Sequence, residues 1–143
     1  MISEPLTRFV DDPTQPLRNA LVDTLITAGD ITSPQIAAAF RVVPRHVFAP
    51  EAPLEQAYRV TEAIRVKRDA RGATISSVSA PYVQARMLAQ AHLAPGMRCL
   101  EIGSGGYHAA LMAELVGSAG QVTTVDIDAD IVQRARQFLA AAG

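Results

Sequence analysis

A glycine-rich turn between two β-like runs is the feature that most constrains how this chain folds. The apolar run 97–102 leads into the turn 103–107. An apolar helical pattern then precedes the run 121–125, which is followed directly by Asp126. Glycines let the backbone turn tightly against a ligand, and an acid about 20 residues later can accept hydrogen bonds from ribose hydroxyls. The pattern predicts a nucleotide-binding β-α-β unit, and an ordinary strand–turn–helix without a ligand is the alternative.

The residues that flank the turn narrow the choice of nucleotide. His108 stands where a dinucleotide-binding turn requires a third glycine, so a dinucleotide is disfavoured. Glu101, just before the turn, adds negative charge that suits a cationic amino group and a sulfonium. Both cations occur in S-adenosylmethionine, which we expect as the cofactor, with S-adenosylhomocysteine as its product. The expected cofactor-binding residues are Glu101, Gly103, Ser104, Gly105, Gly106, Tyr107 and Asp126.

Composition and charge argue against several other partners. The 143 residues are 49% hydrophobic and 19% charged, which is typical of one soluble globular domain. A net charge of −1 gives no electrostatic footprint for nucleic acid or an anionic membrane, and we interpret the basic stretch 59–71 as a solvated segment. No apolar run approaches the roughly 18 residues that span a bilayer, and the start of the chain shows no secretory pattern. We therefore expect a cytoplasmic protein with no nucleic-acid or membrane partner.

The histidines and the cysteine do not indicate a metal site or a nucleophile. His46, His92 and His108 lie far apart, and no acid or cysteine falls beside them at ligand spacing. We expect His46 to pack or to form a hydrogen bond. The single cysteine, Cys99, can form no disulfide within the chain and lies in an apolar run, which favours a buried strand thiol.

The apolar pattern divides the chain into three regions. Residues 1–16 form a polar, proline-containing arm, residues 17–94 an N-terminal helical and connector region, and residues 95–143 the first half of the cofactor-binding domain. Helical patterns start near residues 17, 33, 79, 107 and 129, and a short strand is expected at 64–66.

Two of these helices bear on the site. The run 76–82 is expected to begin the third helix, with Ser79 as its N-cap. The residues expected on the buried face of that helix are Val83, Met87, Leu88 and Ala91. In the helix after the glycine turn, Tyr107 packs either on the donor or on the first helical turn, and the sequence leaves both interpretations open.

The predicted sheet is incomplete. A doubly wound sheet needs several more βα units, whereas this chain supplies two strands of it. We therefore expect the front part of a larger domain, with unpaired strand edges and an uncovered apolar surface. Such edges and surfaces favour self-association.

Three segments resemble one enzyme family in order and spacing. They are Val43-Pro44-Arg45-His46-Val47-Phe48, the run 77–82 and the run 100–105. Over residues 17–142 the chain resembles protein-L-isoaspartate O-methyltransferases. The resemblance implies an α/β protein with N-terminal helices followed by the first half, β-α-β-α, of a Rossmann-like seven-stranded methyltransferase fold, truncated after that half.

The resemblance also implies an activity and residue roles. The family transfers a methyl group from S-adenosylmethionine to a carboxylate of aspartyl or isoaspartyl residues in proteins or peptides. By position, Glu101, Gly103 and Gly105 would hold the methionine part of the donor and Asp126 its ribose, while Ser79 matches the active-site serine beside the acceptor carboxylate.

This chain departs from the family pattern in two ways. Its glycine turn is one residue shorter than the usual form, which shifts His108 relative to its counterpart, and the downstream half with the adenine-contacting acid has no counterpart. Shortened turns also occur in methyltransferases of ribosomal-peptide maturation. Two alternatives to repair of aspartyl damage therefore stay open: a peptide-maturation methyltransferase, and a truncated scaffold or interaction module without turnover.

Overall fold

The computed structural model describes residues 12–103 and 105–143. Most of the predicted arm, residues 1–11, therefore lies outside the described residues. The elements in chain order are α1 Gln15–Thr27, α2 Pro34–Val42, the 3₁₀ helix η1 Arg45–Phe48, α3 Leu54–Ala57, β1 Ile64–Arg68, β2 Thr74–Val78, α4 Pro81–Ala91, β3 Arg98–Ile102, α5 Tyr107–Val116, β4 Gln121–Val125 and α6 Ala129–Ala142. No helix among them is long and apolar enough to cross a membrane.

The second half of the chain is the predicted β-α-β-α unit. Strands β3 and β4 are parallel, with Arg98 opposite Gln121 and Ile102 opposite Val125. The ladder continues into the glycine turn, because the Gly103 N–H donates to the Val125 carbonyl at 2.8 Å. Mixed α/β architecture with helices ahead of a parallel pair is the expected fold class, which the structure confirms.

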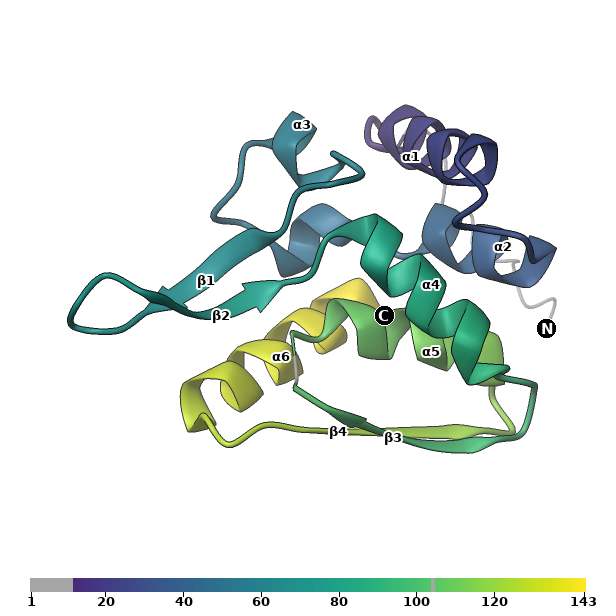
Figure 1. The fold of residues 1–143 in the computed structure, drawn as a ribbon. Helices are drawn as coiled ribbons and strands as arrows, with labels where there is room; N and C mark the ends of the chain where they lie inside the picture. Colours follow the sequence, from purple (N-terminus) through teal and green to yellow (C-terminus); the bar gives the residue numbers. More distant parts are fainter. Residues whose placement is uncertain (1–11, 104) are drawn as a thin grey trace, which may run out of the picture.

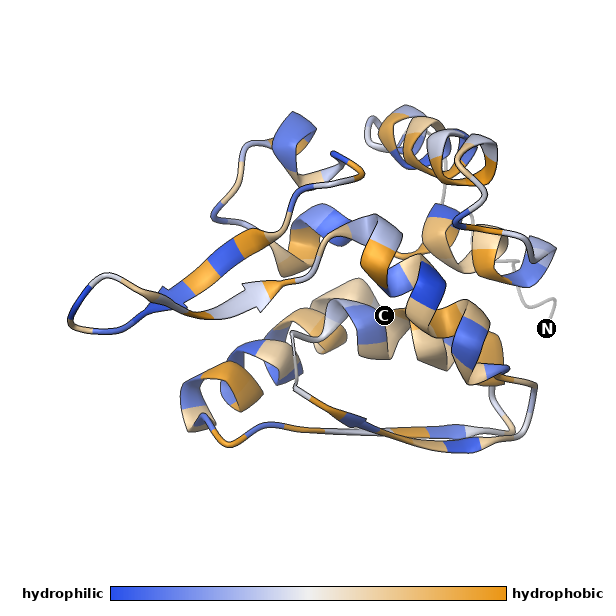
Figure 2. Ribbon diagram, in the orientation of Figure 1, coloured by the Kyte–Doolittle hydropathy of each residue, from blue (hydrophilic) through white to orange (hydrophobic). Residues whose placement is uncertain are grey.

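The β3–β4 pair is covered on one face only. In Figure 1 it lies along the bottom of the molecule, with α4, α5 and α6 above it. The other face carries apolar side chains: Leu100 is 64% exposed, Ile102 84%, and Ile127 just beyond β4 is fully exposed. Figure 2 shows these hydrophobic segments alternating with polar ones along both strands. The expected uncovered apolar surface is present, and self-association through it remains a prediction.

The N-terminal helices and the β-α-β-α unit share one hydrophobic core. Helix α2 starts where the sequence predicts, with Ser33 Oγ accepting a hydrogen bond from the Ile36 N–H at 3.4 Å. Its Phe40 ring packs edge-on against Tyr107 of α5, with ring centroids 6.2 Å apart. The core therefore extends across the predicted boundary between regions 17–94 and 95–143. The division of the chain into these regions stays a prediction.

The expectation for residues 76–91 is wrong in two respects and partly wrong in a third. Residues 74–78 form strand β2, antiparallel to β1, and not the start of a helix. Helix α4 begins at Pro81, its N-cap residue is Ala80, and Ser79 does not cap it. The reason is that Pro81, with its fixed φ, is suited to the first helical position. The buried face of α4 is only partly as expected: Leu88 is buried, but its buried neighbours are Pro81, Gln84 and Ala85. Met87 is 49% exposed and Ala91 is exposed.

Two short elements were not predicted from the sequence. The connector holds η1 and α3, which lie on either side of Pro50 and Pro53. The basic stretch contains β1, at the place where a short strand was expected, and β1 pairs with β2 in a hairpin that projects from the body of the molecule in Figure 1. This hairpin places β2 beside the glycine turn, since a Cβ on Gly105 would lie 3.8 Å from Val78 Cγ2.

Candidate functional site

A cleft of about 330 Å³ lies between the β1–β2 hairpin and the ends of β3 and β4. One wall is formed by β2 and the start of α4. The opposite wall is formed by the ends of β3 and β4, the glycine turn and the start of α5. The cleft is lined by Ile75, Ser76, Ser77, Val78, Ser79, Gln84, Met87, Glu101, Ile102, Gly103, Gly105, Tyr107, His108 and Asp126. Six of the eight residues predicted for the site therefore meet in one place.

The glycine turn has two positions that only glycine suits. Gly103 has φ +95° and its Cβ position faces open space, so the backbone is bare toward the cleft. Gly106 has φ +84°, and a Cβ there would lie 3.0 Å from Phe48 Cδ1. Gly106 is buried behind the turn and does not line the cleft, so its contribution is to let the turn close. Ser104 lies outside the described residues.

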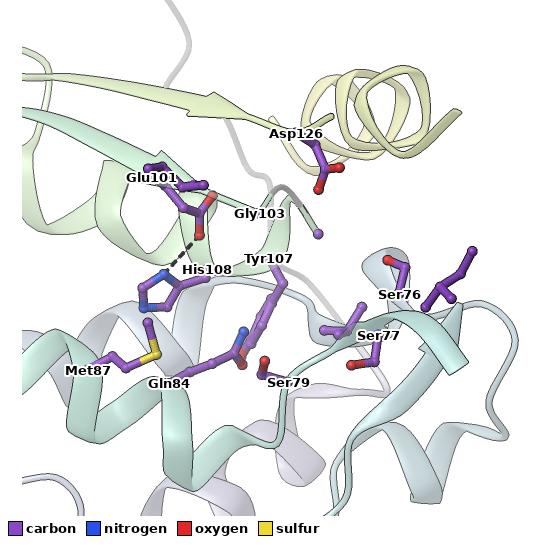
Figure 3. Close-up of a pocket in the computed structure, with 14 residues that line it drawn as sticks. Ser76, Ser77, Ser79, Gln84, Met87, Glu101, Gly103, Tyr107, His108 and Asp126 are labelled. Atoms are coloured by element: carbon purple, nitrogen blue, oxygen red, sulfur yellow. Dashed lines mark hydrogen bonds and ion pairs between the residues drawn. The ribbon is translucent and has the colours of Figure 1, made fainter. Parts of the chain in front are cut away.

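Glu101 lies at the end of β3 with its carboxylate largely buried. Its Oε1 lies 2.9 Å from His108 Nδ1, drawn as the dashed line in Figure 3, and its Oε2 accepts a hydrogen bond from the Thr124 hydroxyl. A carboxylate has about four acceptor positions, so these two contacts leave capacity for a ligand donor. His108 Nε2 is buried and has no hydrogen-bond partner among the described residues.

Tyr107 belongs to the core more than to the cleft. Its side chain is fully buried against Phe40 and Phe48, and the Arg45 guanidinium lies 5.0 Å from its ring centroid. Burial raises the pKa of the Tyr107 phenol, which therefore stays protonated. The ring thus packs on α2 and η1, while Tyr107 also lines the cleft, so a contact with the donor stays a prediction.

Asp126 directly follows β4 and lines the same cleft as Glu101. Because β3 and β4 are parallel, their carboxyl ends meet at one edge, which brings these two carboxylates to one side of the cleft. Asp126 Oδ1 accepts a hydrogen bond from the Asp128 N–H at 2.9 Å, at the start of α6. The carboxylate is thus held at the strand end, as the motif predicts.

Ser79 stands on the opposite wall, between β2 and α4. It is exposed, lines the cleft, and its backbone carbonyl accepts a hydrogen bond from Arg45 Nη2 at 2.8 Å. Figure 3 shows Ser79 facing the cleft beside Ser77 and Gln84. The expectation that Ser79 and the glycine turn share one site is therefore met in position, while the chemical role of Ser79 stays a prediction.

Several residues of the cleft were missed in the sequence. Gln84 and Met87 come from α4, and Ser76 and Ser77 come from β2. One signal was available for Gln84, a polar residue at helical spacing between the apolar Pro81 and Leu88. No local pattern indicates that Ser76 and Ser77 lie near the glycine turn, because the hairpin brings them there.

An ion pair beside the cleft joins the β1–β2 hairpin to the start of α6. Lys67 of β1 donates to Asp128 Oδ2 at 2.6 Å and to Asp130 Oδ2 at 2.9 Å, at the start of α6. The hydrogen bond from Lys67 lowers the pKa of Asp128, and the hydrogen bonds to Asp128 and Asp130 raise the pKa of Lys67. The interpretation of the whole basic stretch as solvated is therefore incomplete, since Lys67 is paired.

The remaining titratable candidates have structural contacts. His46 Nδ1 lies 2.9 Å from the Tyr58 hydroxyl, and burial lowers the pKa of His46. Cys99 is a free thiol, partly buried on β3 against the core. Within residues 12–103 and 105–143, no three His, Cys, Asp or Glu side chains gather in a way that could hold a metal ion.

The family model for protein-L-isoaspartate(D-aspartate) O-methyltransferases matches residues 16–143, nearly the whole chain. The chain belongs to this family. A protein-L-isoaspartate O-methyltransferase of Picosynechococcus sp. is 39% identical over 140 residues, which are 97% of this chain and 59% of the relative. One of Ignicoccus hospitalis is 40% identical over 127 residues, covering 88% of this chain and 57% of the relative.

Two solved structures are also similar. A protein-L-isoaspartate O-methyltransferase aligns with a TM-score of 0.76 at 32% identity, over 87% of this chain and 38% of its own. A Plasmodium falciparum protein, described as a candidate enzyme of this kind in complex with S-adenosyl-L-homocysteine, aligns with a TM-score of 0.73 at 20% identity, over 87% of this chain and 56% of its own. The chain thus spans little more than half the length of the curated relatives that it matches.

Proposed function

We propose that this chain forms the donor-binding half and the acceptor serine of an S-adenosylmethionine-dependent carboxyl O-methyltransferase that acts on isoaspartyl residues of proteins or peptides. The observation that carries the proposal is that Ser79 and the glycine turn, far apart in the sequence, line one cleft together with Glu101 and Asp126. The names of the relatives and the ligand of the Plasmodium protein support it.

The donor fits the wall built by β3, β4 and α5. S-adenosylmethionine carries a cationic sulfonium and an ammonium, and Glu101 offers an anionic carboxylate beside the turn. The bare backbone at Gly103 allows close approach, and Asp126 offers oxygens for the two ribose hydroxyls. When bound, the donor supplies an electrophilic methyl group. This chain would hold its methionine end and its ribose.

The acceptor side needs little chemistry from the protein. A carboxylic acid with a pKa of about 4 is ionised at neutral pH, so the acceptor needs no general base. The walls have to align the acceptor oxygen with the methyl group and keep water away. We expect the Ser79 hydroxyl, which lines the opposite wall, to hold the acceptor carboxylate. The compartment we expect is the cytoplasm.

The test is methyl transfer in two peptides that differ at one residue. The chain is incubated with methyl-labelled S-adenosylmethionine and a peptide that contains isoaspartate, or the same peptide with aspartate. We expect a base-labile methyl ester on the isoaspartyl peptide alone. Binding of S-adenosylhomocysteine without transfer to either peptide would contradict the proposal and favour the scaffold alternative. Transfer to the aspartyl peptide alone would favour peptide maturation.

A further inference from the structure

The guanidinium of Arg45 is buried without a carboxylate partner among the described residues. Its side chain is fully buried. It donates from Nε to the Ala57 carbonyl at 2.7 Å, from Nη1 to Gln84 Oε1 at 2.9 Å, and from Nη2 to the Ser79 carbonyl at 2.8 Å. Nη2 also lies 3.5 Å from the Glu62 carbonyl. The charge is therefore stabilised by neutral acceptors alone.

A second buried arginine shows the more usual arrangement. Arg18 of α1 is also almost fully buried, but it forms an ion pair with Asp12 and hydrogen-bonds to Thr14 and to the Arg41 carbonyl. The contact with the Arg41 carbonyl joins α1 to α2, and neither Arg18 nor its partners line the cleft. Burial lowers the pKa of Arg45. Burial also acts to lower the pKa of Arg18, but its contacts with Asp12 and Tyr58 together outweigh burial and raise that pKa.

The contacts of Arg45 converge on the cleft. Ser79, Gln84 and Tyr107 come from the end of β2, from α4 and from α5, and each lines the cleft. Arg45 hydrogen-bonds to the first two and lies over the ring of the third at 5.0 Å. Burying a cation without a counter-ion costs free energy of desolvation. This cost is best explained by the segments around the cleft that Arg45 holds in place.

We infer that Arg45 is a positioning residue for the wall formed by β2 and the start of α4, which we call the acceptor wall. Its guanidinium fixes Ser79 and Gln84 against Tyr107 and so sets the geometry in which an acceptor carboxylate meets the donor. The role of the wall rests on the proposed function. The fixation itself does not, because it is a property of the free protein. Lysine cannot replace Arg45, since an ammonium cannot reproduce the planar set of donors that reaches three acceptors in different directions.

The experiment is amide hydrogen exchange on the 143-residue chain, comparing Arg45→Lys with the matched Arg18→Lys. The reporters are amides near Ser79 with hydrogen bonds of their own, which are Tyr82, Val83 and Gln84. In Arg45→Lys we expect about tenfold faster exchange at these amides, the effect of one lost hydrogen bond, and little change in α1. In Arg18→Lys we expect the reverse pattern.

Equal acceleration in all helices for Arg45→Lys would overturn the inference, because Arg45 would then serve only overall stability. No change at the reporters would overturn it as well. If Arg45→Lys does not fold, Gln84→Met removes one of the acceptors and carries the same expectation at the same amides.

A second readout separates positioning from general stability. In an active protein, Arg45→Lys should lower kcat for the isoaspartyl peptide about tenfold or more while the KM for S-adenosylmethionine changes little, and Arg18→Lys should leave both unchanged. A rise in the donor KM with unchanged kcat would overturn the inference. If neither protein binds the donor, the proposed function fails, whereas the exchange result still decides the role of Arg45.

Discussion

The two walls of the cleft are held in place by different means. The wall formed by β3, β4 and the glycine turn is fixed by a parallel ladder and by glycines at φ +95° and +84°. The wall formed by β2 and the start of α4 is fixed by side chains from distant positions: Arg45 binds it directly, and Lys67 of the paired strand β1 binds the start of α6. The first wall depends on local backbone geometry and the second on long-range polar contacts. Substitutions should therefore affect them separately.

The largest effect is expected at Gly120, which joins α5 to β4. A Cβ there would lie 2.5 Å from Val116 Cβ and 2.7 Å from the Met97 carbonyl oxygen. Gly120→Ala should lower the free energy of unfolding by about 3 kcal/mol, because neither neighbour can move without shifting backbone. Urea denaturation measures this, with the exposed Ser118→Ala as the control, expected to stay within about 0.5 kcal/mol of the unsubstituted chain. Equal stabilities for the two variants would contradict the close packing.

The next largest effect tests only the wall formed by β3, β4 and the glycine turn. Asp126→Ala should weaken S-adenosylhomocysteine binding by roughly 1 to 3 kcal/mol, the loss expected for hydrogen bonds to a charged group. Calorimetric titration measures this, and Glu114→Ala on the exposed side of α5 removes a charge without touching the cleft. The amides of the hairpin should exchange as before. Unchanged affinity in Asp126→Ala would remove the ribose assignment.

A smaller effect tests the acceptor wall. Ser79→Ala should lower turnover by about tenfold, the equivalent of one hydrogen bond, with little change in donor affinity or stability. Ser33→Ala is the matched comparison, because Ser33 does cap a helix, and this variant should lose about 1 kcal/mol of stability without a change in turnover. A Ser79→Ala variant that loses stability but keeps its turnover would make Ser79 a structural residue.

The smallest effect is expected at the ion pair that joins the β1–β2 hairpin to the start of α6. Lys67→Gln should weaken S-adenosylhomocysteine binding by about threefold or less. Added salt should lower the affinity of the unsubstituted chain until it approaches that of the variant, because salt screens the ion pair. Because Lys67 lowers the pKa of Asp128, the pair stabilises the fold above the ordinary aspartate pKa of about 3.9, and this contribution is lost as the pH falls. Lys67→Arg keeps the charge and should behave like the unsubstituted chain. An unchanged salt dependence in Lys67→Gln would show that the pair contributes nothing.

The same contrast explains what could be predicted from sequence. Strand β4 was expected at 121–125 and lies there, because alternation, the glycines and Asp126 are local signals. Strand β2 was mistaken for the start of a helix, because Ser76 and Ser77 resemble a helix-capping run and the pairing of β2 with β1 has no local signature. The buried face of α4 was assigned only partly correctly for a related reason: Leu88 is buried as expected, but Gln84 is buried by its contact with Arg45, 39 residues earlier in the chain.

The open face of the β3–β4 pair was predicted correctly for a general reason. Two parallel strands with helices on one side must leave the other side bare, and Leu100 and Ile102 are exposed there. The arrangement agrees with the share of the relatives that the chain spans, 59% for the Picosynechococcus protein. Within this part of the fold the cleft is still lined by Gly103 and Gly105 of the glycine turn, by Asp126 after β4 and by Ser79.

The central claim is that these residues form a donor site, and one titration tests it most directly. The 143-residue chain and its Asp126→Ala variant are titrated with S-adenosylhomocysteine in a calorimeter, with the mass in solution recorded in parallel. The account predicts micromolar binding by the unsubstituted chain and about 5- to 150-fold weaker binding by the variant, which corresponds to roughly 1 to 3 kcal/mol. No binding by a folded chain, or equal binding by both proteins, would contradict it.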